Sequence, residues 1–170
     1  MRASSFYTVP FVWNKTLWVM TFAVFGLWLG VSGFQLYEIF TQKETLEPLI
    51  ALIVLNAIML PTIIICEGLA PQRLEICRDK IVILRRYKSI TISANEIMSV
   101  ERLPEGAMRG AIRTFGVGGL FGYFGSYRTR KLGSFTLYAT SFPNLFLIRK
   151  CDGKNVVISC AEPDKMEIFL

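Results

Sequence analysis

The sequence predicts a membrane-spanning helical hairpin followed by a mainly-β soluble domain with one short terminal helix. Two apolar runs, 17–40 and 48–66, are close to the ~20 residues that an α-helix needs to cross a bilayer. After residue 70, short alternating segments separated by turn residues are typical of β-strands. Residues 67–170 hold 16 of the 19 Lys and Arg and 10 of the 13 Asp and Glu, so they carry the whole net charge of +6. We therefore divide the chain into a hairpin region, 1–70, and a soluble domain, 71–170.

The two apolar runs contain few polar residues. Gln35 and Glu38 lie near the end of the first run, and Asn56 lies at depth in the second. A core helix of this length normally has a polar face, and the first run exceeds the 7–15 residues of a signal-peptide core. Both runs are therefore predicted spans, and the three polar residues are candidates for an intramembrane function. The alternatives are that Glu38 reaches the interface and that Asn56 hydrogen-bonds across the hairpin.

Basic residues predict the orientation of the hairpin. Arg2 and Lys15 precede the first span, whereas the connector, 41–47, has Lys43 and two glutamates. Five basic residues follow the second span within ~20 residues: Arg73, Arg78, Lys80, Arg85 and Arg86. Since Lys and Arg concentrate on the cytoplasmic side, both termini of this multi-pass chain should lie in the cytoplasm. Three aromatic residues suit the aromatic belts at the two interfaces: Trp13, Trp18 and Tyr37.

Catalytic, metal and disulfide chemistry has little support in the sequence. The chain has no histidine and no CxxC pair, so neither a zinc site nor a base that titrates near neutral pH is expected. Paired carboxylates are missing, and no Ser or Cys has an evident activating base. Asp152 and Gly153 predict a two-residue hairpin turn, which places Cys160 opposite Leu145 and ~20 Å from Cys151, too far for a disulfide. We expect no enzyme, no metal and no cofactor.

Short strands and turn residues predict the architecture of the soluble domain. Alternating apolar residues indicate six or seven strands: 74–76, 81–84, 89–92, 97–103, 135–140, 144–150 and 155–160. Residues 93–96 have the spacing of a capping box and predict a short helical turn. Residues 159–162 repeat that spacing and Pro163 suits an early helical position, so 164–170 should form a short terminal helix. These elements predict two packed sheets or an open barrel.

Glycines, aromatic residues and flanking basic residues are concentrated in 110–133. Because glycine lets the backbone approach another surface closely, Phe121, Tyr123 and Phe124 are candidates for insertion at a bilayer interface. Five basic residues are then candidates to bind anionic headgroups, at about 1 kcal/mol each near the surface: Arg109, Arg113, Arg128, Arg130 and Lys131. The alternative is a bent strand whose aromatic residues pack on the core.

The region that follows the predicted hairpin resembles bacterial membrane proteins with a pleckstrin-homology-like (PH-like) domain. The segments that carry this resemblance are 74–84, 90–100, 115–125 and 132–140. The most specific match is Phe-Gly-Val-Gly-Gly-Leu-Phe-Gly-Tyr-Phe-Gly at 115–125, and Val-Ile-Ser-Cys from Val157 supports it. The resemblance covers most of the soluble domain. It implies a PH-like open barrel of two packed antiparallel sheets, closed at one end by a C-terminal helix. The membrane of such a protein is expected to be the inner (cytoplasmic) membrane.

A second basic cluster, Arg85, Arg86 and Lys88, lies near a predicted strand turn and has two interpretations, a phosphate contact or a solvated hairpin end. Basic charge beside a membrane follows from topology alone, so we expect no nucleic-acid partner. The predicted function is a membrane-anchored, cytoplasm-facing binding or scaffolding module that presents a protein- or lipid-interaction surface. Its expected partners are membrane lipids and either a partner protein or a second copy. The alternative, based on Glu38 and Asn56, is a small accessory subunit of an oligomeric channel or transporter.

Overall fold

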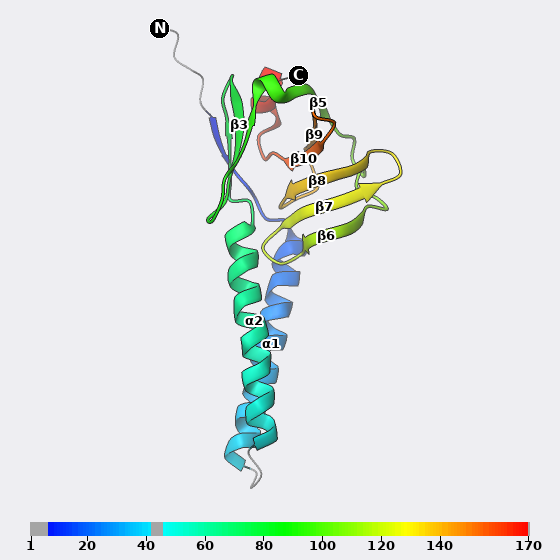
Figure 1. Cartoon of the computed structure of the whole chain (residues 1–170). Helices are drawn as coiled ribbons and strands as arrows, with labels where there is room; N and C mark the ends of the chain where they lie inside the picture. Colours follow the sequence, from blue (N-terminus) through cyan, green and yellow to red (C-terminus); the bar gives the residue numbers. More distant parts are fainter. Residues whose placement is uncertain (1–6, 42–45, 170) are drawn as a thin grey trace.

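The computed structural model describes residues 7–41 and 46–169. Arg2, Lys43 and Leu170, which enter the predictions of orientation and of the terminal helix, lie outside the described residues. The described chain is a long helical hairpin that carries a β-rich domain at one end (Figure 1). The first and last described segments, 7–10 and 163–169, both pack in the domain, so the hairpin leaves the domain and returns to it.

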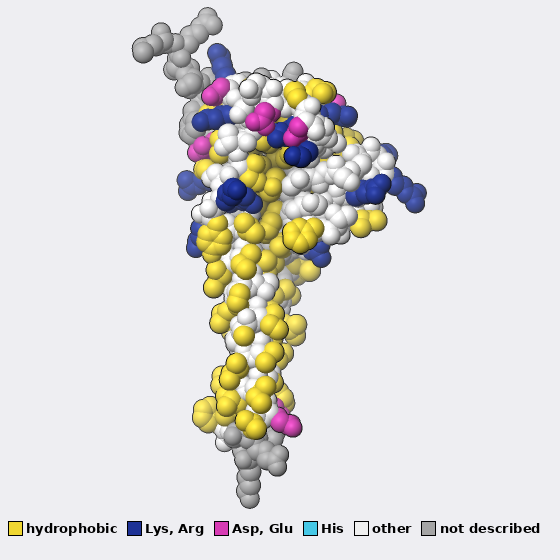
Figure 2. All heavy atoms as spheres, viewed as in Figure 1, with side chains coloured by type: hydrophobic (Ala, Val, Ile, Leu, Met, Phe, Trp, Pro, Cys, Tyr) yellow, Lys and Arg dark blue, Asp and Glu magenta, His cyan; other side chains and the backbone are white. Residues whose placement is uncertain are grey.

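Two helices form the hairpin, α1 (Lys15–Thr41) and α2 (Leu46–Leu69), which confirms the two predicted apolar helices. The Asn14 side chain caps α1, because its Oδ1 accepts a hydrogen bond from the Leu17 amide at 2.7 Å. Both helices are long and apolar enough to cross a membrane, and only 11% and 6% of their most apolar windows are buried. Figure 2 shows apolar side chains along the exposed hairpin. Since the core helix of a soluble protein is mostly buried, this exposure favours lipid as the surroundings.

Sheet A has four antiparallel strands in the order β1-β2-β3-β4. Their bounds are β1 (Tyr7–Pro10), β2 (Arg73–Ile76), β3 (Lys80–Leu84) and β4 (Ile90–Ser93). The sequence analysis did not predict β1. This strand precedes the hairpin and pairs with β2, which follows it, so that Val9 lies opposite Leu74. The pairing requires both ends of the hairpin to lie on the same side.

Sheet B has six strands in the order β5-β9-β10-β8-β7-β6. Their bounds are β5 (Ile97–Arg102), β6 (Ile112–Gly118), β7 (Tyr123–Thr129), β8 (Gly133–Ala139), β9 (Leu145–Lys150) and β10 (Asn155–Ser159). The prediction of a fully antiparallel sheet was wrong, because β10 runs parallel to β8, with Val157 opposite Leu137. The run Val156, Val157 and Ile158 is buried throughout, as suits a central strand covered on both faces.

The predicted two-residue turn between β9 and β10 was also wrong. Three residues, 151–153, form the loop, and the Lys150 amide donates to the Lys154 carbonyl at 3.0 Å. Gly153 has φ 79°, a conformation that glycine adopts without strain at the end of such a loop. The register therefore shifts by one residue, and Cys160 faces Asn144 rather than Leu145.

Two short 3-10 helices occupy the segments where helical turns were predicted. Residues 94–96 form η1 (Ala94–Glu96), although the Ser93 side chain makes no cap hydrogen bond. The chain continues after β10 into η2 (Pro163–Phe169), which starts at the expected proline but is a 3-10 helix. Its Met166 is fully buried and packs in the core.

Hydrophobic clusters cover both faces of sheet B. One cluster lies between the sheets, with Ile83 of sheet A and Phe146, Ile148 and Ile158 of sheet B among its members. The other cluster lies on the opposite face and is covered by the segment 103–111, through Leu103, Met108 and Ala111. The two sheets are separate in the described chain and are not closed into a barrel. Sheet B is thus the central layer, and the 103–111 segment forms an outer layer where the candidate site lies.

Candidate functional site

The glycine- and aromatic-rich stretch folds into a hairpin of β6 and β7, whose two strands the sequence analysis did not separate. Gly116 of β6 pairs with Gly125 of β7. A Cβ added at Gly116 would lie 2.3 Å from the Phe124 carbonyl oxygen, and one at Gly125 would lie 2.3 Å from the Phe115 carbonyl oxygen. Both residues also have φ near +120°. The two glycines are therefore required for the close approach of these strands.

The β6–β7 turn, residues 119–122, contacts α1. The Thr21 hydroxyl donates to the Gly119 carbonyl at 3.3 Å and accepts from the Phe121 amide at 3.4 Å. The Phe121 ring lies with its centroid 6.1 Å from those of both Trp13 and Phe25. Phe121, a candidate for insertion at a bilayer interface, thus packs partly buried against the first turns of the long helix.

Phe124 is 5% exposed and packs against Cys66 and Ala70 at the end of α2. Of the two interpretations that the sequence left open for Phe124, the strand residue packed on the core describes it, rather than insertion at a bilayer interface. Alternation along β7 explains this, because Phe124 and its neighbour Tyr123 point to opposite faces of the sheet. The ring of Tyr123 lies 4.6 Å from that of Phe142 on the outer face.

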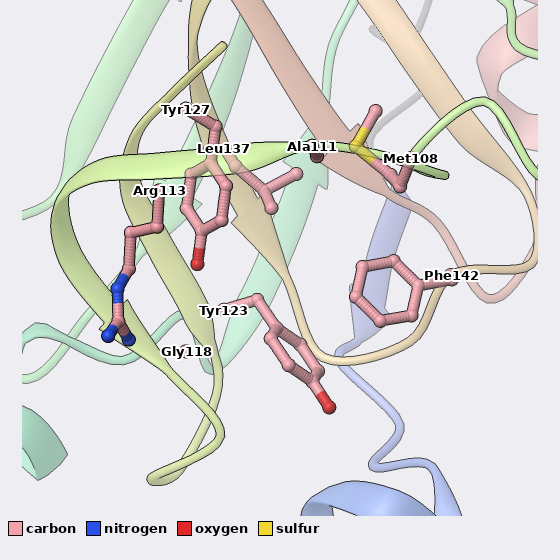
Figure 3. A pocket seen from close by; sticks show the side chains of 8 residues that line it. All are labelled: Met108, Ala111, Arg113, Gly118, Tyr123, Tyr127, Leu137 and Phe142. Atoms are coloured by element: carbon pink, nitrogen blue, oxygen red, sulfur yellow. The ribbon is translucent and has the colours of Figure 1, made fainter. Parts of the chain in front are cut away.

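An aromatic pocket of about 400 Å³ lies on this outer face (Figure 3). Its wall consists of Met108, Ala111, Arg113, Gly118, Tyr123, Tyr127, Leu137 and Phe142. In Figure 3, Arg113 lies on one side of Tyr127, whereas Tyr123 and Phe142 lie on the other. Gly118 leaves room for the Arg113 guanidinium, because a Cβ there would come within 2.9 Å of it.

The two pocket tyrosines are neutral hydrogen-bonding groups. The Tyr127 hydroxyl donates to the Val117 carbonyl at 2.9 Å. Burial raises the pKa of Tyr127, an effect that the charge of Arg113 opposes. Burial also raises the pKa of Tyr123, and a hydrogen bond with Asn14 opposes that shift. The pocket therefore offers one cation, from Arg113, on an otherwise apolar and aromatic wall.

A larger basic groove of about 1280 Å³ lies between the 103–111 segment and the β7–β8 turn. Four of the predicted binding residues line it: Arg109, Arg128, Arg130 and Lys131. All four are exposed, and among the described residues none of them forms an ion pair. The fold thus brings together side chains up to 22 residues apart in sequence. Glu105 also lines the groove, so four basic side chains stand there with one carboxylate.

A model of the bacterial PH domain family matches residues 72–170. The chain belongs to the bacterial PH domain family. The matched region runs from the start of β2 to the end of the chain and contains both the pocket and the groove. No curated protein and no solved structure matches the chain.

The segment that contains the second basic cluster contacts α2. Arg86 forms an ion pair with Glu67 at 2.9 Å, and Arg85 lies over the Tyr138 ring at 5.7 Å. Tyr87, which follows Arg86, donates its amide hydrogen to the Gly68 carbonyl at 3.1 Å. Arg85 also donates to the carbonyl of Lys88, whose side chain is exposed. Of the three predicted basic residues, Arg86 thus attaches the domain to the hairpin, whereas Arg85 contacts groups of the domain itself.

The intramembrane candidates lie on both helices of the hairpin. Asn56 donates to the Leu52 carbonyl of its own helix at 2.8 Å, so the expected hydrogen bond across the hairpin is replaced by one within α2. Gln35 and Glu38 lie half-buried on α1. In the described hairpin, the Gln35 Oε1 is buried without a hydrogen-bond partner, as is the Oγ of Ser32 one turn earlier.

Two exposed apolar residues of the PH domain were missed by the sequence analysis. Ile112 is 69% exposed and Phe115 is 80% exposed, and both lie on the edge strand β6. The sequence did contain a signal for an exposed apolar site, because Ile112 and Phe115 lie within a segment that is flanked by arginines. It was not recognised because the strand boundaries in 110–133 were not resolved.

Proposed function

We propose that this bacterial PH domain protein is a membrane-anchored, cytoplasm-facing binding module that presents the basic groove to an anionic group of a protein or a lipid. In this proposal, sheets A and B form the PH-like open barrel and η2 caps one end. PH domains are generally non-catalytic binding modules. The module would act by presenting a surface, with no chemical step.

The observation that carries the proposal is the unpaired charge of the groove. Elsewhere on the domain, Arg149, Lys150 and Lys154 are each within 4.0 Å of a carboxylate. Arg128 and Arg130, by contrast, form no ion pair within the described part of the chain. The four basic residues of the groove also outnumber its acidic lining residue, Glu105. Such an excess of like charge creates a positive potential, which attracts an anionic partner.

Anchoring supports the same function. The excess of basic residues flanking the hairpin favours a cytoplasmic domain. A tethered domain also meets membrane-bound partners at a high effective concentration, so that even weak contacts become occupied. The groove therefore does not need high intrinsic affinity.

Site-specific photo-crosslinking in native membranes tests this function. A photo-crosslinking amino acid at residue 131, inside the groove, should yield adducts with a lipid or a protein. The matched control is residue 154, an exposed lysine that directly follows the β9–β10 loop. That loop lies beside the start of β5, whereas the groove lies beyond the end of β5. Adducts from residue 131 should be lost when Arg109, Arg128 and Arg130 are replaced by Glu. Equal adducts from both positions, or adducts that survive the charge reversal, would contradict the proposal.

The accessory-subunit alternative has weaker support. Two helices do not enclose a pore, so transport would require several copies or a partner. The Asn56 side chain donates to the Leu52 carbonyl of its own helix. The binding-module function is therefore the one that we retain.

A further inference from the structure

We propose that the outer edge of β6 rests in the headgroup region of an anionic bilayer, beside the hairpin. This inference rests on the proposed membrane anchoring and names a lipid surface as the partner of this edge. β6 is the last strand of sheet B, so one of its edges has no neighbouring strand. Its first residues are exposed, including the large apolar side chains of Ile112 and Phe115. Figure 1 shows β8, β7 and β6 in succession toward the hairpin, so β6 is the strand of this sheet nearest to the level of the helices.

The length of α1 places this edge at the right depth. Its 27 residues are ~40 Å long at 1.5 Å per residue, ~10 Å more than a hydrocarbon core of ~30 Å. When the far end of α1 is at the far boundary, the first six residues or so lie within the near headgroup layer. Thr21, which binds the β6–β7 turn, follows those six residues. The turn therefore marks the boundary of the hydrocarbon, and β6 extends from it at headgroup level.

The surroundings of the edge combine apolar and basic side chains. Arg113 lies between Ile112 and Phe115 in sequence, and Arg128 is paired opposite Ile112. Figure 2 shows apolar atoms on the underside of the overhanging end of the domain, with basic side chains at its tip. Apolar residues that enter an interface beside cations that contact phosphates match an anionic lipid surface.

Pairing with the β6 edge of a second copy fits the structure less well. A bulge interrupts the strand, since Arg113 pairs with Tyr127 whereas Phe115 pairs with Ser126. The extra residue, Thr114, directs its hydroxyl to the Ser126 carbonyl at 3.0 Å. Bulges of this kind twist an edge away from further strand pairing. The bulge leaves the apolar side chains exposed while it blocks a continuous ladder with another strand.

Spin labels on the full-length chain in nanodiscs test the depth of this edge. The labels are attached to Phe115→Cys and, as the matched control, to Met98→Cys, both with Cys151→Ser. Met98 is 67% exposed on β5, the opposite edge strand of the same sheet. The nanodiscs contain an equal mixture of phosphatidylglycerol and phosphatidylcholine. We expect the label at residue 115 to be more accessible to oxygen and less accessible to a polar nickel chelate than the label at residue 98.

Three outcomes separate the possible failures. Equal, water-like accessibility at residues 115 and 98 would overturn the inference. A short spin–spin distance between two chains labelled at residue 115 would also overturn it, in favour of a second copy. A third label, at Leu29→Cys on the exposed face of α1, must report a hydrocarbon environment. If it does not, the proposed membrane anchoring itself has failed.

Discussion

At the scale of residues, glycine explains how an aromatic-rich stretch forms a tight hairpin. Gly116 and Gly125 face each other, and neither position has room for a Cβ. The sequence showed that glycine was enriched in this stretch and suggested close backbone approach. It did not show which surface is approached, because that depends on the pairing of β6 with β7. The approach turns out to be between two strands of one hairpin.

The close approach of Gly116 and Gly125 predicts that adding one methyl group there strongly lowers the free energy of unfolding. Gly116→Ala should lower the free energy of unfolding by about 2–6 kcal/mol, because backbone strain and overpacking both contribute. Gly133→Ala is the control, since Gly133 has φ 69° but no atom within 4 Å of an added Cβ. It should cost only about 1–2 kcal/mol. Thermal unfolding of the full chain in detergent micelles measures both, and equal losses would refute the role of close approach.

At the scale of elements, the helical hairpin and the domain are joined by specific contacts. The β6–β7 turn binds Thr21 of α1, and the β3–β4 connection binds Glu67 and Gly68 of α2. The linker before α1 is also held, because the Thr140 hydroxyl donates to the Val12 carbonyl at 2.9 Å. The domain is therefore fixed on the hairpin rather than tethered loosely to it.

Loss of the Thr21 hydroxyl should loosen the β6–β7 turn. Thr21→Val removes the donor to Gly119 and the acceptor for the Phe121 amide, each worth about 1 kcal/mol or less. We expect about fivefold faster amide hydrogen exchange at Phe121, the factor that 1 kcal/mol gives. Thr62→Val is the control, because Thr62 bonds only to Ile58 of its own helix. Unchanged exchange at Phe121 would show that the turn is not held by α1.

Sequence patterns predicted most elements but not their partners. Apolar runs and alternation placed both long helices and seven of the strands correctly, since these signals are local. β1 has only four residues and finds its partner β2 more than 60 residues away, beyond the reach of a local pattern. The basic residues were identified from composition, yet only the fold shows that four of them share one groove. The sequence left two interpretations open for Phe124, because its burial depends on α2, which precedes it by some 60 residues.

At the scale of the whole molecule, the architecture sets where each surface can act. β1 and β2 pair across the hairpin, so the domain is assembled from both sides of it and lies at one end. In our proposal that end is cytoplasmic, the β6 edge contacts the bilayer and the basic groove lies at the overhanging tip. All three assignments depend on the orientation of the hairpin, which is the central claim.

Labelling of the native Cys151 tests this claim most directly. Cys151 is exposed on the domain, whereas Cys66, Cys77 and Cys160 are buried. A membrane-impermeant maleimide should therefore report the side of the membrane on which the domain lies, with Cys151→Ser as the control for specificity. We predict labelling in inverted membrane vesicles and none in intact spheroplasts. Labelling of Cys151 in intact spheroplasts, with none in inverted vesicles, would contradict the account.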